Sequence, residues 1–136
     1  MKKILFLFSM LSIFASCSSI EKEIELLPID YLTAGNYKIW QLKSYTVNGV
    51  DQLSDCLRDD TFIFNKKIGT YDWKKGDVLC SDADTDISFN FSLSQDGTIM
   101  TINEYDYKVN KLDIKNLELE ITLNGHVQIL TYSIIE

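Results

Sequence analysis

The sequence predicts an all-β protein built as a single eight-stranded, up-and-down antiparallel barrel. In residues 86–93 the apolar residues occupy odd positions and the polar ones even positions, which is typical of a strand with one buried face. Residues 117–123 repeat the alternation, with Glu118 and Glu120 on the polar face. Asn124-Gly125 then separates two alternating segments, and this dipeptide is a strong hairpin signal. No ten-residue segment has the spacing of an amphipathic helix.

Turn residues and alternation together place eight strands. They are expected at residues 38–47, 60–65, 69–75, 86–93, 98–103, 106–112, 117–124 and 126–135. Almost all neighbours are joined by a few residues, so successive strands are expected to pair as a meander. Closing the meander into a barrel removes its two exposed edges, and eight strands leave an interior for side chains or one small ligand. A two-sheet β-sandwich is the alternative architecture.

The N-terminal residues predict export and attachment to a membrane. Lys2 and Lys3 precede an apolar stretch, residues 4–14, that is too short to span a membrane and is typical of a secretory signal peptide. Phe14-Ala15-Ser16-Cys17 resembles the lipobox of bacterial lipoproteins, which implies cleavage before Cys17 and acylation of its thiol. Two or more acyl chains hold a protein stably on a bilayer. The alternative is an ordinary secretory peptide that happens to contain a cysteine.

The predicted organisation has three parts. Residues 1–16 form the lipoprotein signal peptide, residues 17–37 a lipid-anchored tether with a short helical turn, and residues 38–136 the barrel domain. Pro28 argues against a long helix in the tether. Ser18 follows the cysteine where lipoprotein sorting would need Asp for retention, so the resemblance implies an outer-membrane lipoprotein of the cell envelope, on the periplasmic face or the cell surface.

The charge of the chain excludes one class of partner. The sequence carries 20 acidic against 13 basic residues, a net charge of −7, and removal of residues 1–16 would make it −9. An acidic protein of this size is a poor binder of nucleic acid and of anionic lipid by charge alone. The expected contact with the membrane is therefore the acyl group on Cys17.

Two further cysteines predict a disulfide. With Cys17 acylated, Cys56 and Cys80 remain as an even pair in an oxidising compartment. A bridge between them would contribute roughly 3–4 kcal/mol. The alternative is two buried free thiols.

Residues suited to catalysis or metal binding are few, so we expect neither an enzyme nor a cofactor. The single histidine, His126, follows a hairpin turn and is expected to be solvated at a barrel rim. Asp82, Asp84 and Asp86 alternate as in the start of a calcium loop, and they are the weak alternative for a metal site. Ile87 and Leu93 stand where such a loop needs Gly and Glu, so a solvated acidic loop is the preferred interpretation.

Seven aromatic residues are expected to lie on the inner face of the first four strands. They are Trp40, Phe62, Phe64, Tyr71, Trp73, Phe89 and Phe91. One interpretation is a pocket for a small apolar molecule, since such pockets are concave and mostly apolar. The other is a barrel filled by its own rings, which would leave a structural or interaction module without a ligand.

Several segments resemble the bacterial lipocalin-like lipoproteins. The resemblance covers about residues 38–135 and lies in Trp40–Ser44, Val47-Asn48-Gly49, Asp59–Phe64 and Asp96-Gly97-Thr98. It implies a small eight-stranded barrel in which the early tryptophan, Trp40, closes the bottom. The expected function is therefore a membrane-tethered envelope lipoprotein whose barrel holds a small hydrophobic ligand, and the alternative is a filled barrel that contacts an envelope protein.

Overall fold

A computed structural model describes residues 26–135 of the chain. The expected signal peptide, the lipidation site at Cys17 and the first part of the tether lie outside these residues. No helix within the described part is long and apolar enough to cross a bilayer.

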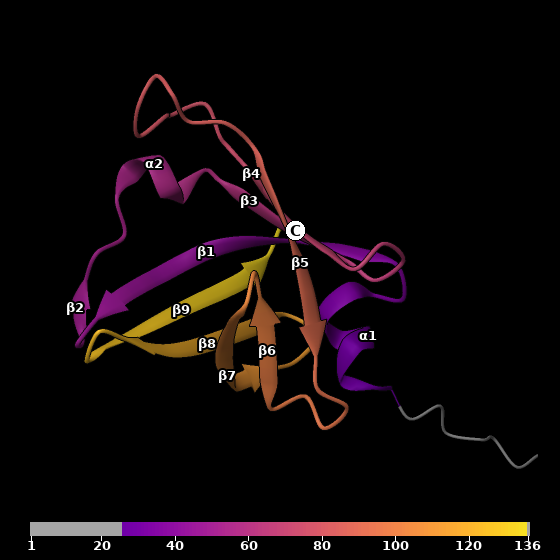
Figure 1. Cartoon of the computed structure of the whole chain (residues 1–136). Coiled ribbons are helices and arrows are strands. Elements are labelled where there is room, and N and C mark those ends of the chain that lie inside the picture. Colours follow the sequence, from indigo (N-terminus) through magenta and orange to yellow (C-terminus); the bar gives the residue numbers. More distant parts are fainter. Residues whose placement is uncertain (1–25, 136) are drawn as a thin grey trace, which may run out of the picture.

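The fold is a closed antiparallel barrel of eight strands (Figure 1). These are β1 (Tyr37–Val47), β3 (Thr61–Asn65), β4 (Thr70–Lys74), β5 (Ile87–Leu93), β6 (Ile99–Ile102), β7 (Tyr105–Leu112), β8 (Asn116–Leu123) and β9 (His126–Ile134). Each pairs with its neighbour in the barrel, as the sequence predicted. Two short elements were not predicted: β2 (Val50–Asp51), which pairs with the end of β1, and the four-residue helix α2 (Asp55–Arg58).

Pairing of β1 with β9 closes the barrel and rules out the sandwich alternative. The register runs from Trp40 opposite Ile134 to Val47 opposite Gln128. It is interrupted by a bulge between Leu42 and Ser44. An extra residue at a bulge shifts the alternation, so the strand can turn Leu42 inward before it and Tyr45 inward after it.

Tight turns join the strands where the sequence supplies residues that tolerate positive φ. Asn124-Gly125, between β8 and β9, has φ values of 51° and 80°, the signs that a type I′ hairpin turn requires. Asn48-Gly49 makes the same kind of turn between β1 and β2. Asn103-Glu104, between β6 and β7, also has two positive φ values, although its second position is not glycine.

One end of the barrel is sealed by the helix α1 (Pro28–Thr33), within the segment where the sequence predicts a helical turn. Pro28 occupies the start of the helix, where its missing N–H is not needed. Leu32 and Thr33 are completely buried, and the indole Nε1 of Trp40 donates a hydrogen bond of 3.0 Å to the carbonyl oxygen of Leu32. We call this the closed end.

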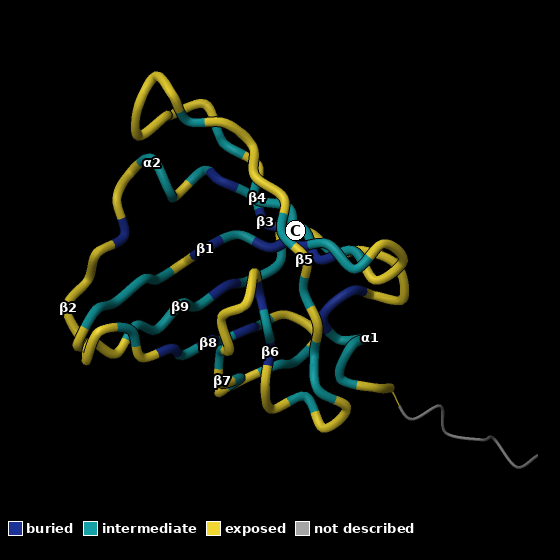
Figure 2. Tube along the Cα trace, viewed as in Figure 1, coloured by how far each residue is buried: buried dark blue, intermediate teal, exposed yellow. Residues whose placement is uncertain are grey.

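The core follows the alternation of the strands (Figure 2). In β8, Leu117, Leu119 and Ile121 are buried while the glutamates between them are more exposed. In β3, Phe62 and Phe64 are buried in the same way. Ile87 departs from the prediction: it begins β5 and is exposed, because the barrel wall ends there.

At the opposite, open end, two long connections are tied together. The predicted disulfide between Cys56 and Cys80 is confirmed and joins α2 to the loop between β4 and β5. The bridge therefore links residues 48–60 to residues 75–86, two connections on the side of the barrel away from α1 (Figure 1).

Removal of this bridge should lower the stability of the protein. The cysteines are 24 residues apart, so the double variant Cys56→Ser, Cys80→Ser should lose about 3–4 kcal/mol of unfolding free energy. Urea denaturation of the two proteins would measure the difference, and a reductant should shift the parent alone. Equal midpoints for parent and variant, with and without reductant, would contradict this account.

Candidate functional site

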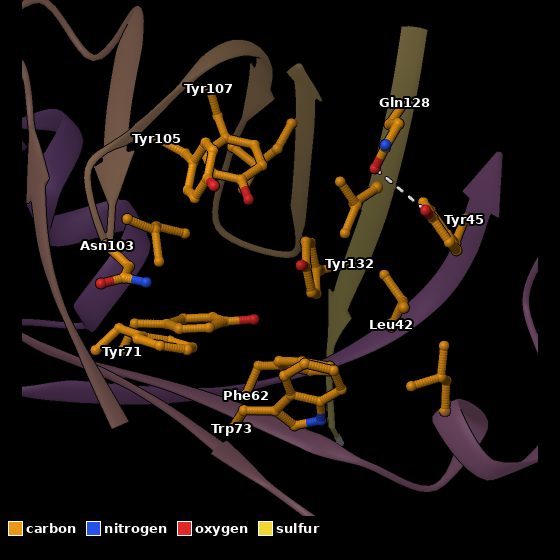
Figure 3. A pocket seen from close by; sticks show the side chains of 15 residues that line it. Leu42, Tyr45, Phe62, Tyr71, Trp73, Asn103, Tyr105, Tyr107, Gln128 and Tyr132 are labelled. Atoms are coloured by element: carbon orange, nitrogen blue, oxygen red, sulfur yellow. Dashed lines mark hydrogen bonds between the residues drawn. The ribbon is translucent and has the colours of Figure 1, made fainter. Parts of the chain in front are cut away.

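A cavity of about 350 Å³ occupies the half of the barrel nearest the open end. Fifteen side chains line it (Figure 3). They are Leu42, Tyr45, Leu57, Phe62, Tyr71, Trp73, Phe89, Ile102, Asn103, Tyr105, Tyr107, Leu119, Gln128, Leu130 and Tyr132. All the barrel strands contribute to this set, and Leu57 of α2 adds a contact at the mouth.

The structure divides the seven predicted aromatic residues into two groups. Phe62, Tyr71, Trp73 and Phe89 line the cavity. The other three, Trp40, Phe64 and Phe91, pack towards the closed end. Trp40 and Phe64 are completely buried there, and Phe64 meets Phe91 edge to face at 5.2 Å between ring centroids. The filled-core and pocket interpretations therefore describe different halves of the same barrel.

Sequence reasoning missed four tyrosines and two amides in the cavity wall. Asn103 and Gln128 are the amides; the tyrosines are Tyr45, Tyr105, Tyr107 and Tyr132. Alternation in residues 105–112 and 126–134 could have identified most of them, since Tyr105 and Tyr107 share one face, as do Gln128 and Tyr132. Tyr45 could not be placed in this way, because the bulge in β1 lies before it.

Ring-to-ring contacts make one side of the cavity a continuous aromatic wall. Phe62 lies 5.5 Å from Trp73 and meets Tyr132 edge to face at 5.2 Å. The ring of Tyr71 stacks on Phe89 at 6.5 Å and on Phe62 at 5.9 Å. Such packing restricts each ring to one orientation and gives a bound molecule flat faces to contact.

Polar groups in the cavity are neutral phenols and amides. The hydroxyl of Tyr45 donates to Oε1 of Gln128 at 3.1 Å (Figure 3). Tyr71, Tyr105, Tyr107 and Tyr132 turn their hydroxyl groups towards the same space in this view. These groups can donate or accept hydrogen bonds at several points around an apolar ligand.

Burial raises the pKa of three of these phenols, so they stay protonated to a higher pH than an exposed tyrosine. Desolvation, followed by the effect of Tyr132, raises the pKa of Tyr71 well above its usual value of 10. Desolvation also raises the pKa of Tyr132 and that of Tyr107. At neutral pH all three are therefore uncharged hydrogen-bonding groups.

A buried carboxylate behind the wall fixes the position of Trp73. Asp60 is completely buried, and its Oδ2 accepts a hydrogen bond of 2.6 Å from Nε1 of Trp73. Its other oxygen accepts the backbone N–H of Gly76 at 2.8 Å. The Nζ of Lys75 lies 3.4 Å from Asp60 and 3.8 Å above the centre of the Trp73 ring. Charge, hydrogen bond and cation–π contact thus hold one indole at the cavity edge.

The remaining predicted residues do not gather into a site. Asp84 accepts the backbone N–H of Cys80, whereas Asp86 binds Lys74 and the backbone N–H of Lys75. Within residues 26–135 no three His, Cys, Asp or Glu side chains are placed to share a metal ion. The ring of His126 contacts the Asn48 side chain at 2.8 Å on the rim, where it is exposed.

Comparison with known proteins identifies one family. The model of the family described as Lipocalin-like domain matches residues 37–133, which span the whole barrel almost to its last residue. A search of curated proteins found no match.

The buried phenols should make the protein less stable at high pH. Above pH 10, Tyr71 and Tyr132 lose their phenolic protons in the unfolded chain, while in the folded chain they retain them. The stability that these two tyrosines contribute is therefore fully present below about pH 10. As the pH rises above that value, each of them should reduce the unfolding free energy by about 1.4 kcal/mol per pH unit. Urea titrations between about pH 8 and 11 would measure this slope.

The variant Tyr132→Phe should have a shallower slope, and the exposed control Tyr37→Phe should keep that of the parent. A parent protein whose stability is constant up to pH 11 would contradict the assignment.

Proposed function

Because this chain belongs to the lipocalin-like domain family, we propose that it binds a small, mainly apolar molecule inside its barrel. The observation that carries the proposal is the open cavity of about 350 Å³ with an aromatic wall and neutral polar tips. Small-molecule sites are concave and mostly apolar, with a few polar groups that orient the ligand.

The size of the cavity sets the size of the ligand. An apolar protein cavity of about 150 Å³ holds benzene, and this one is a little over twice as large. A molecule of two fused or linked rings would fill it. The packed rings at the closed end prevent deeper entry, so the ligand would enter between α2 and the β6–β7 turn.

The chemistry of the lining supports binding without catalysis. Three of the phenols that face the space, those of Tyr71, Tyr107 and Tyr132, have pKa values raised by burial, which makes them poor proton donors and acceptors at neutral pH. None of the fifteen lining side chains is a carboxylate, histidine or cysteine that could act as a base or nucleophile.

We further propose that the barrel is a lipoprotein of the bacterial envelope, anchored through Cys17. The support is the lipobox-like stretch Phe14–Cys17 behind a short apolar segment. Leu26, the first described residue, leads directly into α1 at the closed end. An anchor joined there would leave the cavity mouth facing away from the membrane.

Ligand binding can be tested with the uncharged dye N-phenyl-1-naphthylamine. The protein used is the full chain carrying Cys17→Ser, which removes the acylation site, so that dye partitioning into attached lipid does not contribute. It should bind the dye at one saturable site, with an increase in dye fluorescence. Leu130→Trp would fill part of the cavity and should weaken binding at least tenfold. Ile99→Trp, on an exposed strand position, is the matched control and should bind as the parent does. An affinity for the dye that Leu130→Trp leaves unchanged, or the absence of saturable binding to the parent, would reject the cavity as a ligand site.

The anchor has its own test. Cys17→Ser should abolish acylation, because a hydroxyl does not replace the thiol as acceptor in the lipoprotein family. The parent should enter the detergent-rich phase on partitioning, and the variant should stay in the aqueous phase. If the variant still partitions into detergent, the anchor lies elsewhere.

A further inference from the structure

The walls of the cavity carry no charge. Its fifteen lining side chains, all within the described residues, are aliphatic, aromatic, phenolic or amide. An ionised group brought into such a space loses its hydration, and this loss is costly unless an opposite charge or several hydrogen bonds replace it. The cavity offers phenols and amides to a ligand, and it offers no cation to an anion.

A cluster of charged groups lies behind Trp73, and its charges sum to a negative value. Asp59 and Asp60 stand here against Lys75, which is engaged with both Asp60 and the Trp73 ring. Asp59 accepts the backbone N–H of Val78 through Oδ2, while its Oδ1 is buried and has no hydrogen-bond partner. The cluster therefore adds no positive group that an anionic ligand could use.

The two loops at the mouth are strongly acidic. Residues 48–60 and 75–86 together contain eight aspartates, against Arg58 and Lys75. The disulfide holds these loops together above the entrance. At the closed end, residues 26–36 and the turns 65–70, 93–99 and 112–116 contain three acidic and three basic residues. The negative potential is thus concentrated at the end where a ligand enters, and such a rim repels anions and attracts cations.

We infer that the barrel selects against negative charge and takes an uncharged or amine-bearing ring compound. A fatty acid, whose carboxylate would be left at the acidic mouth or in the uncharged interior, does not fit this arrangement. A flat molecule with a hydroxyl or amine fits it, since the aromatic wall contacts the rings and the phenols and amides contact the polar group. This inference rests on the proposed function and specifies its ligand class.

Two dyes that differ by a single sulfonate provide the test. N-phenyl-1-naphthylamine is uncharged, and 8-anilinonaphthalene-1-sulfonate adds one negative charge to the same ring system. Calorimetric titration of the chain carrying Cys17→Ser should give an affinity at least about tenfold higher for the uncharged dye. Added salt should narrow the difference, because it screens the acidic mouth.

A charge-introducing variant tests the cause of the selectivity. Gln128→Lys places an ammonium group on the cavity wall and should raise the affinity for the sulfonated dye several-fold. Gln128→Met is the matched control: it removes the same hydrogen bond to Tyr45 without adding charge, and it should leave the preference unchanged.

The outcomes separate the two proposals. Equal binding of both dyes at the cavity, or a preference for the sulfonated one, would overturn the charge selection and leave ligand binding intact. Saturable binding of neither dye would overturn ligand binding itself. Unchanged affinity of Gln128→Lys for the sulfonated dye would show that the missing cation is not the cause, which also contradicts the inference.

Discussion

Pairing between the first and last barrel strands is the constraint on which the rest of this structure depends. β1 and β9 are joined from Trp40 opposite Ile134 to Val47 opposite Gln128. This contact removes both edges of the sheet and creates an interior with two distinct ends. The bulge in β1 lies within the same pairing, and it turns Tyr45 towards Gln128 on the neighbouring strand. Closure and cavity lining thus have a common origin.

The two ends of the barrel differ because different groups satisfy their backbone and fill their volume. At the closed end, α1 places the Leu32 carbonyl against the Trp40 indole, and Phe64 and Phe91 occupy the space above it. Leaving that carbonyl without its donor in the core would be costly, so the helix and the indole keep each other in place. At the open end the inward rings line a space that they do not fill. A binding function is compatible with a stable core because the two lie in different halves.

Electrostatics at the mouth links structure to specificity. Asp60 is buried to position Trp73, and Lys75 partly compensates its charge. The close approach of Gly76 to Asp59 has a steric consequence, since a Cβ on this glycine would overlap the Asp59 carboxylate. Asp60, which fixes the orientation of Trp73 in the aromatic wall, also contributes to the acidic character of the entrance. The same carboxylate that orders the site therefore disfavours an anionic ligand.

The sequence by itself determined the strands, their order, the Asn124-Gly125 hairpin and the pairing of Cys56 with Cys80, because each of these depends on alternation, turn chemistry or cysteine count. It also identified which side of most strands faces inward. It did not determine how deep each inward residue lies along the barrel axis, since a period of two distinguishes faces and carries no information on depth. Alternation alone does not distinguish Trp40 from Trp73, and only the resemblance to the lipocalin-like lipoproteins assigned Trp40 to the closed end, where the structure places it. Trp73 lies instead at the edge of the cavity. Only the tertiary structure decided that difference, through closure of strands almost a hundred residues apart, a bulge that reverses one face, and a buried carboxylate that orients one ring.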